Sequence, residues 1–333
     1  MVGFVSSRLF ALILLMLFVL NATIVLLHIV LGAYSVPLHE AFQALVAGGA
    51  DEYHFVVRTL RLPRALIGCL AGACLAISGA LLQGITRNPL AAPSIVGINS
   101  GAALAVVMTM VVWPALSVLF LPLIAFVGAL GAGGFSYLLA SRRSLSPTRL
   151  LVVGVGISAI AGALVTFLLT VGKINDVQRA IIWMAGSVYG RSWEHLWPLL
   201  PWPLILIPAA WMLSRRLDLL QLGEDVAVGL GVNMKRVRTL LLLISVSLAG
   251  AAVATIGTVG FVGLMAPHIA RYLTGASFRR LLPTAALVGG ALVAGADLLG
   301  RILFKPLEIP CGILIALVGT PYMVYLLYRQ RSL

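Results

Sequence analysis

Long apolar runs recur along the whole chain, and they limit its fold more than any other feature. A helix needs about 20 apolar residues to span a bilayer, and about ten segments come near that length. Only 10% of the residues are charged, against about 25% in soluble domains, so the chain cannot cover a water-facing surface. We therefore expect one all-α integral membrane domain over residues 1–333, with about ten transmembrane helices. The segments lie near residues 9–32, 65–85, 95–112, 115–140, 150–171, 196–213, 239–256, 259–270, 283–303 and 312–328.

The first and the eighth segments raise separate questions of processing and length. The first follows Arg8 and is longer than a signal-peptide core of about 7–15 residues, so we expect it to remain in the mature protein. Val259–Ala270 would measure only about 18 Å as a helix, against a hydrocarbon thickness of about 30 Å. We expect it to form a half-length helix inside the protein, where irregular backbone is tolerated.

Basic residues cluster between the apolar segments, and the net charge is +13. With an even number of spans both termini lie on one side, and most of the 23 Lys and Arg residues then fall on that side. The positive-inside rule makes this side the cytoplasm. The basic charge therefore reflects membrane topology, and we expect no nucleic-acid partner.

Two Gly-rich stretches of the chain show a weak similarity to each other. "LAISGALLQGITRNPLAAPSIVGI" and "LAGAAVATIGTVGFVGLMAPHIA" both run from a small-residue helix into a segment broken by Gly or Pro. Interrupted helices in two halves are typical of internal repeats in transporters, although Gly-rich membrane helices resemble one another in any case. The pattern predicts a weak internal repeat.

Catalytic and metal-binding signatures are absent from the sequence. It has no phosphate loop ending in Gly-Lys-Ser/Thr, no His-Glu-x-x-His and no Gly-x-Ser-x-Gly. The five histidines are scattered, and the three cysteines form neither a disulfide framework nor a metal cluster. We expect a protein that is not an enzyme and that binds no metal or cofactor of its own.

Charge inside the apolar segments is also scarce. Asp297 is the one carboxylate clearly within a segment, and Arg301 follows at i+4, so the two can neutralise each other on one helix face. An ion-driven carrier usually needs more ionisable groups along its route. The energy source is therefore expected outside the membrane part, and an ion-gradient-driven secondary transporter is the rival from a different class.

One polar stretch, "RLDLLQLGEDVAVGLGVNMKRVR" at 216–238, interrupts the apolar pattern. Gly223 ends the preceding segment, and Glu224 and Asp225 begin a helix where the helix dipole favours carboxylates. Asn233 is a suitable cap for the helix that continues through "MKRVR". The stretch predicts a short cytoplasmic helix, a turn and a second helix that dock a soluble, energy-supplying partner. An amphipathic interfacial helix is the alternative.

Six separated motifs make the chain resemble the FecCD-type permeases of binding-protein-dependent ABC importers, which carry iron-siderophores and cobalamin. The resemblance runs from about Arg58 to Arg329. The motifs are "LRLPR" at 60–64, "LAISGALLQGITRNPLAAPSIVGINSGAALA" at 75–105, "LGEDVAVGLGV" at 222–232, "GFVGLMAPHIAR" at 260–271, "RRLLP" at 279–283 and "ADLLGR" at 296–301.

The resemblance implies an assembly in the bacterial inner membrane. A second permease subunit, identical or homologous, would pair with this one, and two ATPase subunits that bind ATP and Mg would dock in the cytoplasm. A periplasmic or lipid-anchored substrate-binding protein would dock outside. The residues of "RAIIWMAGSVYGR" and of the 75–105 motif are most similar to those of ferric citrate and ferric hydroxamate permeases. A ferric siderophore or iron chelate is therefore the expected cargo. Cobalamin and haem permeases of the family are the alternatives.

The resemblance also implies roles for single residues. Arg61, Arg64 and Arg301 would hold acidic residues of the binding protein, as the guanidinium fork suits. The alternatives are interfacial snorkelling for the first two and pairing with Asp297 for the third. ATPase-coupling residues would be Leu222, Gly223, Glu224, Ala227, Leu230 and Gly231.

The translocation pathway is expected to be formed by the fifth apolar segments of the two permease subunits and by the loop that follows the second apolar segment. "TRNPLAAPSIVGINSG" contains two prolines, so it cannot be helical throughout. The resemblance implies that Asn88 and Leu90 narrow the cytoplasmic exit. The pathway and gate residues would be Asn88, Leu90, Asn99, Ser100, Ser146 and Thr148. Farther on, "DVQRAIIWMAGSVYGRSW" predicts an outer interfacial helix, or a plain aromatic belt.

Overall fold

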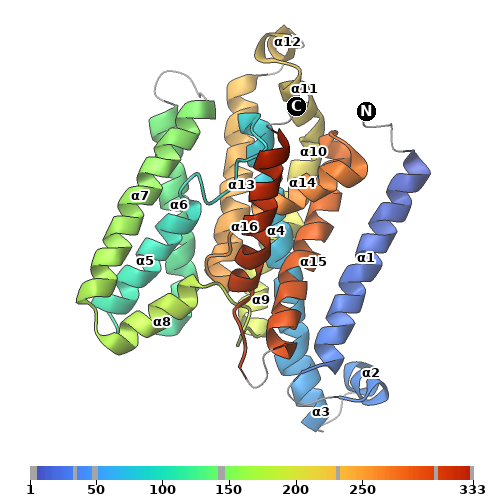
Figure 1. Ribbon diagram of the computed structural model, residues 1–333, viewed down its shortest axis with the longest axis vertical. Helices are drawn as coiled ribbons and strands as arrows, with labels where there is room; N and C mark the ends of the chain where they lie inside the picture. Colours follow the sequence, from blue (N-terminus) through green and yellow to red (C-terminus); the bar gives the residue numbers. More distant parts are fainter. Residues whose placement is uncertain are drawn as a thin grey trace.

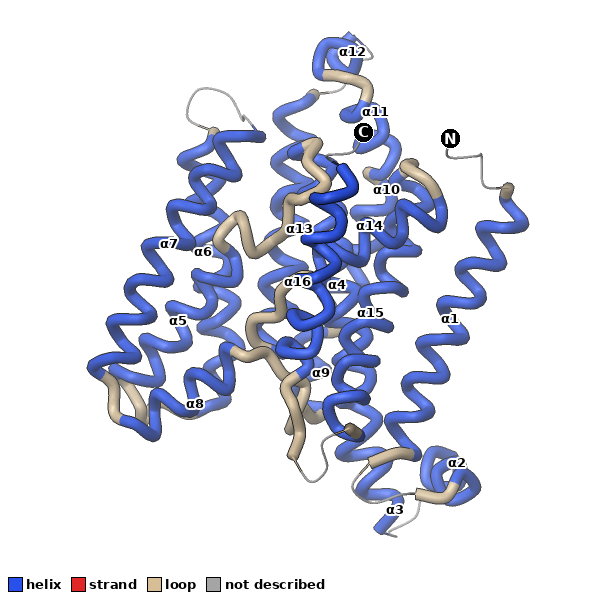
Figure 2. The backbone as a smooth tube through the Cα atoms, viewed as in Figure 1, coloured by secondary structure: helices blue, strands red, loops and turns tan. Residues whose placement is uncertain are grey.

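The fold is known from a computed structural model, which describes residues 6–32, 36–46, 52–141, 147–229, 233–303 and 307–330. This part of the chain folds into helices joined by loops and turns, with no strand (Figure 2). The helices are α1 Ser7–Val30, α2 Leu38–Val46, α3 Glu52–His54, α4 Leu62–Thr86, α5 Ile98–Val112, α6 Leu121–Ala140, α7 Pro147–Val171, α8 Ile174–Met184, α9 Trp193–Leu199, α10 Pro201–Met212, α11 Ser214–Gln221, α12 Glu224–Gly229, α13 Met234–Ile256, α14 Val262–Thr274, α15 Phe278–Ile302 and α16 Cys311–Gln330. A π-helical turn, Phe55–Arg61, leads into α4, and a 3₁₀ turn, Val118–Phe120, leads into α6.

Every predicted apolar segment contains a helix, but not every helix is long enough to cross a bilayer alone. Within the described residues, six helices have the length and composition of a span, and the bent pair of α9–α10 with α11 would make seven. α5 and α16 are shorter apolar helices. The protein is therefore an all-helical, multi-pass membrane protein, and a count of ten would need these two shorter helices and the half-length helix α14 as well.

The predicted half-length helix is present as α14, but it begins three residues later than expected. Gly257 and Phe261 have φ of 77° and 63°, so the chain turns sharply between α13 and α14. α14 has 13 residues, or about 20 Å of helix. It therefore reaches only part of the way back along the bundle.

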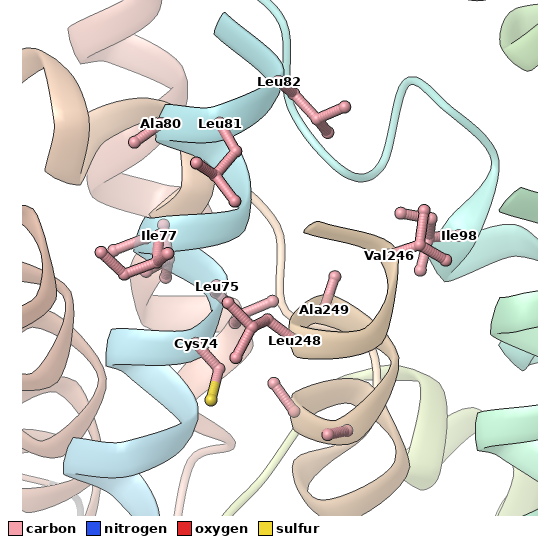
Figure 3. Close-up of a cluster of buried hydrophobic side chains, with 14 of the residues drawn as sticks. Cys74, Leu75, Ile77, Ala80, Leu81, Leu82, Ile98, Val246, Leu248 and Ala249 are labelled. Atoms are coloured by element: carbon pink, nitrogen blue, oxygen red, sulfur yellow. The ribbon is translucent and has the colours of Figure 1, made fainter. Parts of the chain in front are cut away.

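α4 is the centre of the core and packs against α13, α14 and α15. Leu75 of α4 lies beside Leu248 and Ala249 of α13 (Figure 3), and all three belong to the buried apolar core. Small residues let the backbones approach closely, because a methyl group on Gly79 would overlap the carbonyl of Gly263. The backbones of α4 and α14 are therefore in direct contact at this point of the core.

α1 lies at the edge of the bundle. Only 6% of its most apolar stretch of 18 residues is buried in the protein. Most of the surface of α1 therefore faces outward. Polar contacts attach it to α15: Asn21 Nδ2 donates to Leu287 O over 3.0 Å, His28 Nε2 lies 2.9 Å from Ala294 O, and Arg301 donates to His28 O.

The helices place two distinct ends on the molecule. α12 projects beyond the bundle at one end, where α1 begins and α16 finishes (Figure 1). α2, α3 and α8 lie at the opposite end. The polar stretch and the expected outer helix thus lie at opposite ends of the molecule, which agrees with their expected positions on opposite sides of the membrane.

Candidate docking, pathway and coupling sites

The polar stretch at 216–238 forms the predicted pair of helices. α11 ends at Gln221, Gly223 has a φ of 122° that favours glycine, and α12 begins at Glu224 as expected. Asn233 caps α13, because its Oδ1 accepts a hydrogen bond from the N–H of Arg236 over 3.1 Å. The glycine, the acidic helix start and the Asn cap were therefore reliable sequence signals.

The α11–α12 region exposes apolar side chains in a part of the chain that is otherwise polar. Leu222 is 63% exposed and Val228 is 56% exposed, whereas Ala227 is buried. Exposed apolar side chains on and just before α12, with Ala227 buried against the protein, make this region suited to enter a groove on another protein. Leu230, Gly231 and the side chain of Glu224 lie outside the described residues. The exposed apolar side chains are Leu222, Val226 and Val228.

α11 connects α12 to the core through polar bonds to two helices. Asp218 accepts hydrogen bonds from the N–H of Phe278 over 2.8 Å and from Ser277 Oγ over 3.0 Å, at the start of α15. Gln221 Nε2 donates to Gly84 O over 3.0 Å, near the end of α4. A force on α12 therefore reaches α4 and α15 through α11.

The loop after α4 is a folded segment rather than a helix. Arg87 ends α4 with a φ of 51°, and Asn88 Oδ1 then accepts from the N–H of Leu90 over 2.9 Å in an Asx turn. Asn88 and Leu90 are half-buried. Ser136 Oγ of α6 donates to Val96 O over 2.7 Å and holds the far part of the loop.

The other expected pathway residues are separated along the bundle. Asn99 Nδ2 in the first turn of α5 donates to Val259 O over 3.4 Å, and its Oδ1 is buried without a partner in the described chain. Ser100 is half-buried beside it, and Thr148 is exposed in the first turn of α7. Ser146 lies outside the described residues. α4, which precedes Asn88, finishes toward the α12 end, and α7, whose first turn holds Thr148, begins there (Figure 1).

The three expected docking arginines lie together at the opposite end, and all have internal partners. Arg64 binds both oxygens of Asp297, with Nε at 2.7 Å and Nη2 at 2.9 Å, and its Nη2 also lies 2.8 Å from Glu308. Arg61 and Arg301 are each 6% exposed, and Arg64 is 8% exposed. A partner carboxylate would therefore have to displace an internal acceptor.

Arg61 and Arg301 hold the C-terminal end of α1. Arg61 Nη1 donates to Ile29 O over 2.5 Å, and Arg301 Nη2 donates to His28 O over 2.7 Å and to Leu31 O. These carbonyls have no partner within the helix, so cations are favoured there. The end of α1 is thus capped by two guanidiniums, one from the π-helical turn before α4 and one from α15.

The expected pairing of Asp297 with Arg301 is wrong. Asp297 faces Arg64, which is 233 residues away in sequence, and Arg301 turns instead to the carbonyls of α1. Spacing of i, i+4 permits a contact but does not compel one, because a bidentate bond to another helix satisfies the carboxylate better. The local spacing gave no sign of the competing partner.

Comparison with known proteins decides the family. The model of the FecCD transport family matches residues 14–329. The chain belongs to this family. The relationship extends to whole-length relatives, so it covers the membrane domain as a unit.

Three relatives of this FecCD-family chain illustrate the similarity. The "Probable siderophore transport system permease protein YfhA" of Bacillus subtilis is 41% identical, over 94% of this chain and 93% of YfhA. The Fe(3+)-citrate import system permease protein YfmE of B. subtilis is 43% identical, over 86% of each. The Fe(3+) dicitrate transport system permease protein FecD of Escherichia coli is 40% identical, over 92% of this chain and 95% of FecD.

Two solved structures share the fold. A structure titled "An inward-facing conformation of a putative metal-chelate type ABC transporter" has a TM-score of 0.84 and 33% identity, covering 95% of this chain and 99% of that one. PsaBC from Streptococcus pneumoniae in complex with Fab has a TM-score of 0.55 at 17% identity, covering 79% and 90%. The second likeness supports the fold alone, whereas the first agrees with the family assignment.

Proposed function

We propose that this chain is the permease subunit of an ABC importer that moves a ferric siderophore or another iron chelate across the bacterial inner membrane. The names of the relatives support iron over cobalamin or haem as the cargo. In this proposal the ten apolar segments make up the membrane domain, with α14 as a half-length helix inside it. The α12 end faces the cytoplasm, and both termini lie there. ATP and Mg bind to separate ATPase subunits, and a second permease subunit completes the pathway.

The observation that carries the proposal is the α11–α12 pair. α12 projects from the bundle with exposed apolar side chains, and α11 is hydrogen-bonded to the end of α4 and the start of α15. A surface of this kind suits docking into a groove of a soluble ATPase subunit, and the bonds through α11 transmit its movement to the core. An ion-driven carrier has no need for such an element.

Outside, the proposal places the binding protein over the arginine cluster. Glu308 is the accessible partner, since its side chain is 28% exposed while that of Asp297 is 2% exposed. An acidic residue of the binding protein would replace Glu308 at Arg64. Arg61 and Arg301 then act by keeping α1 in place.

The coupling test compares two variants that carry the same substitution at opposite ends. Leu222→Asp adds a charge to the exposed apolar surface beside α12, and Leu119→Asp does the same in the 3₁₀ turn before α6, where the side chain is 75% exposed. The chain is expressed with its partner subunits, and co-purification of the ATPase and ATP-dependent uptake of an iron chelate are measured.

We expect Leu222→Asp to lose ATPase binding and uptake, because burying a charge in an apolar groove is unfavourable. Leu119→Asp should keep both. Wild-type co-purification and uptake in Leu222→Asp would refute the coupling role. Full uptake without any ATPase subunit would refute the importer and support an ion-driven carrier.

A further inference from the structure

A pocket of about 500 Å³ opens at the end of the molecule opposite α12. Its walls come from α8, the loop after α8, the end of α13 and the segment before α16. Aromatic and polar side chains line it, including Trp183, Ser187 and Tyr189, together with the guanidiniums of Arg179 and Arg191. A pocket with aromatic walls and a few polar groups has the character of a small-molecule site.

The backbone around the pocket is tied to two helices. The N–H of Ser187 donates to Ile256 O over 2.7 Å, at the end of α13, and the N–H of Gly312 donates to Gly186 O over 3.0 Å, at the start of α16. Gly257 has a φ of 77°, and a methyl group there would overlap the carbonyl of Trp183. The pocket is therefore formed before any ligand arrives.

Most charges around the pocket are already compensated. Arg179 Nη2 binds Asp176 Oδ1 over 2.5 Å, and Glu308 binds Arg64 over 2.8 Å. Arg64 also lies 5.5 Å from the centre of the Tyr189 ring, so it fixes two walls of the pocket.

Arg191 is the exception among the pocket charges. Its Nε is buried without a hydrogen-bond partner, and no carboxylate of the described chain lies within ion-pair distance of it. Burial lowers the pKa of Arg191 from its ordinary value, but an arginine side chain stays protonated in proteins. A half-buried cation without a partner is unfavourable, so an anion that enters the pocket relieves this cost.

We propose that the pocket is an outer subsite for anionic cargo, in which Arg191 binds a free carboxylate of a ferric chelate. The two terminal Nη groups of the guanidinium can hold both oxygens of a carboxylate, and Trp183 and Tyr189 contact the rest of the chelate. This inference rests on the proposed function and names the charge class of its cargo. A single arginine binds weakly enough to release the chelate onward, as conduction requires.

The test uses the purified importer in nanodiscs and follows quenching of tryptophan fluorescence by two chelates. Ferric citrate is the anionic probe, and an uncharged ferric trihydroxamate is the neutral probe. Trp183→Phe identifies the part of the signal that comes from the pocket. Arg191→Gln is compared with Arg179→Gln, the same substitution at an arginine of this pocket that already has a partner.

We expect Arg191→Gln to weaken ferric citrate binding about tenfold or more, because charged hydrogen bonds are lost, and to leave the neutral chelate unchanged. Arg191→Lys should recover only part of the affinity, since lysine lacks the fork. Arg179→Gln should change ferric citrate binding by less than about threefold, because an exposed ion pair contributes little.

Three results would overturn the subsite. Ferric citrate binding by Arg191→Gln could equal that of the wild type, or both chelates could be lost together with thermal stability. Arg191→Gln could also weaken only the binding protein's affinity, which would make Arg191 a docking contact. Failure of the wild-type importer to take up any iron chelate would instead refute the proposed function.

Discussion

Replacing Asp297 with Asn tests how the beginning of α4 is joined to the end of α15 at the arginine cluster. Asp297 is 2% exposed and accepts two hydrogen bonds from Arg64, at 2.7 and 2.9 Å. Asp297→Asn keeps the shape but removes the buried counter-charge of Arg64, which then has only the partly exposed carboxylate of Glu308 at 2.8 Å. Removal of one partner from a buried ion pair costs about 3–5 kcal/mol.

This loss corresponds to a measurable shift in thermal unfolding. At about 2.1 cal/mol/K per residue, a chain of 333 residues has an unfolding entropy of about 0.7 kcal/mol/K. The midpoint should then fall by about 4–7 °C. Tryptophan fluorescence of the purified protein in detergent follows the transition. Glu308→Gln is the control, and it should cost less than about 1 kcal/mol because the Glu308 carboxylate is partly exposed.

A double-mutant cycle identifies the partner of Asp297. Asp297→Asn is combined with Arg64→Gln in one cycle and with Arg301→Gln in the other. We expect a coupling energy of about 1–3 kcal/mol with Arg64 and a smaller one with Arg301, which bonds to α1 carbonyls. Equal or stronger coupling to Arg301 would refute the geometry and restore the local i, i+4 pair.

Three further changes test other contacts. Gly79→Ala should destabilise the protein by about 1–3 kcal/mol or more through overlap with α14, whereas Gly131→Ala, with open space around it, should have little effect on the unfolding midpoint. Asp218→Ala removes the carboxylate that caps the start of α15, at a cost of about 1 kcal/mol, and uptake should fall while ATPase co-purification persists; loss of both would contradict the transmission role. Arg61→Gln together with Arg301→Gln should release the end of α1, which limited proteolysis after this helix detects; unchanged cleavage would mean that the α15 contacts suffice.

The helices and their ends were largely predictable from the sequence, because the signals are local. Apolar length located the helices, and Gly223 and Asn233 marked the breaks around α12. Val259–Ala270 predicted a half-length helix because length alone excludes a full span. The π-helical turn Phe55–Arg61 before α4 had no such signal. The internal repeat and the assigned roles of single residues remain predictions.

The partners of the arginines were not predictable, because they depend on packing between distant segments. Arg64 and Asp297 meet only after α4 and α15 have packed together. Arg61 and Arg301 donate to the last carbonyls of α1, which have no partner within the helix. A sequence indicates where a helix ends, but it does not indicate which side chain will bond to the carbonyls there. Arg191 carries no motif either, and its uncompensated charge becomes visible only when its surroundings are known.

α4 and α15 join the coupling element to the arginine cluster as one rigid pair. α11 is bonded to both helices at one end, and the Arg64–Asp297 bridge links them at the other. Between these points Gly72 and Gly289 bring the two backbones into direct contact, so no side chain lies between them to absorb a shift. Close-packed interiors transmit displacement rather than damp it. A movement of α12 should therefore reach Arg64, and with it Glu308 and Tyr189 at the pocket wall, as a rigid-body displacement.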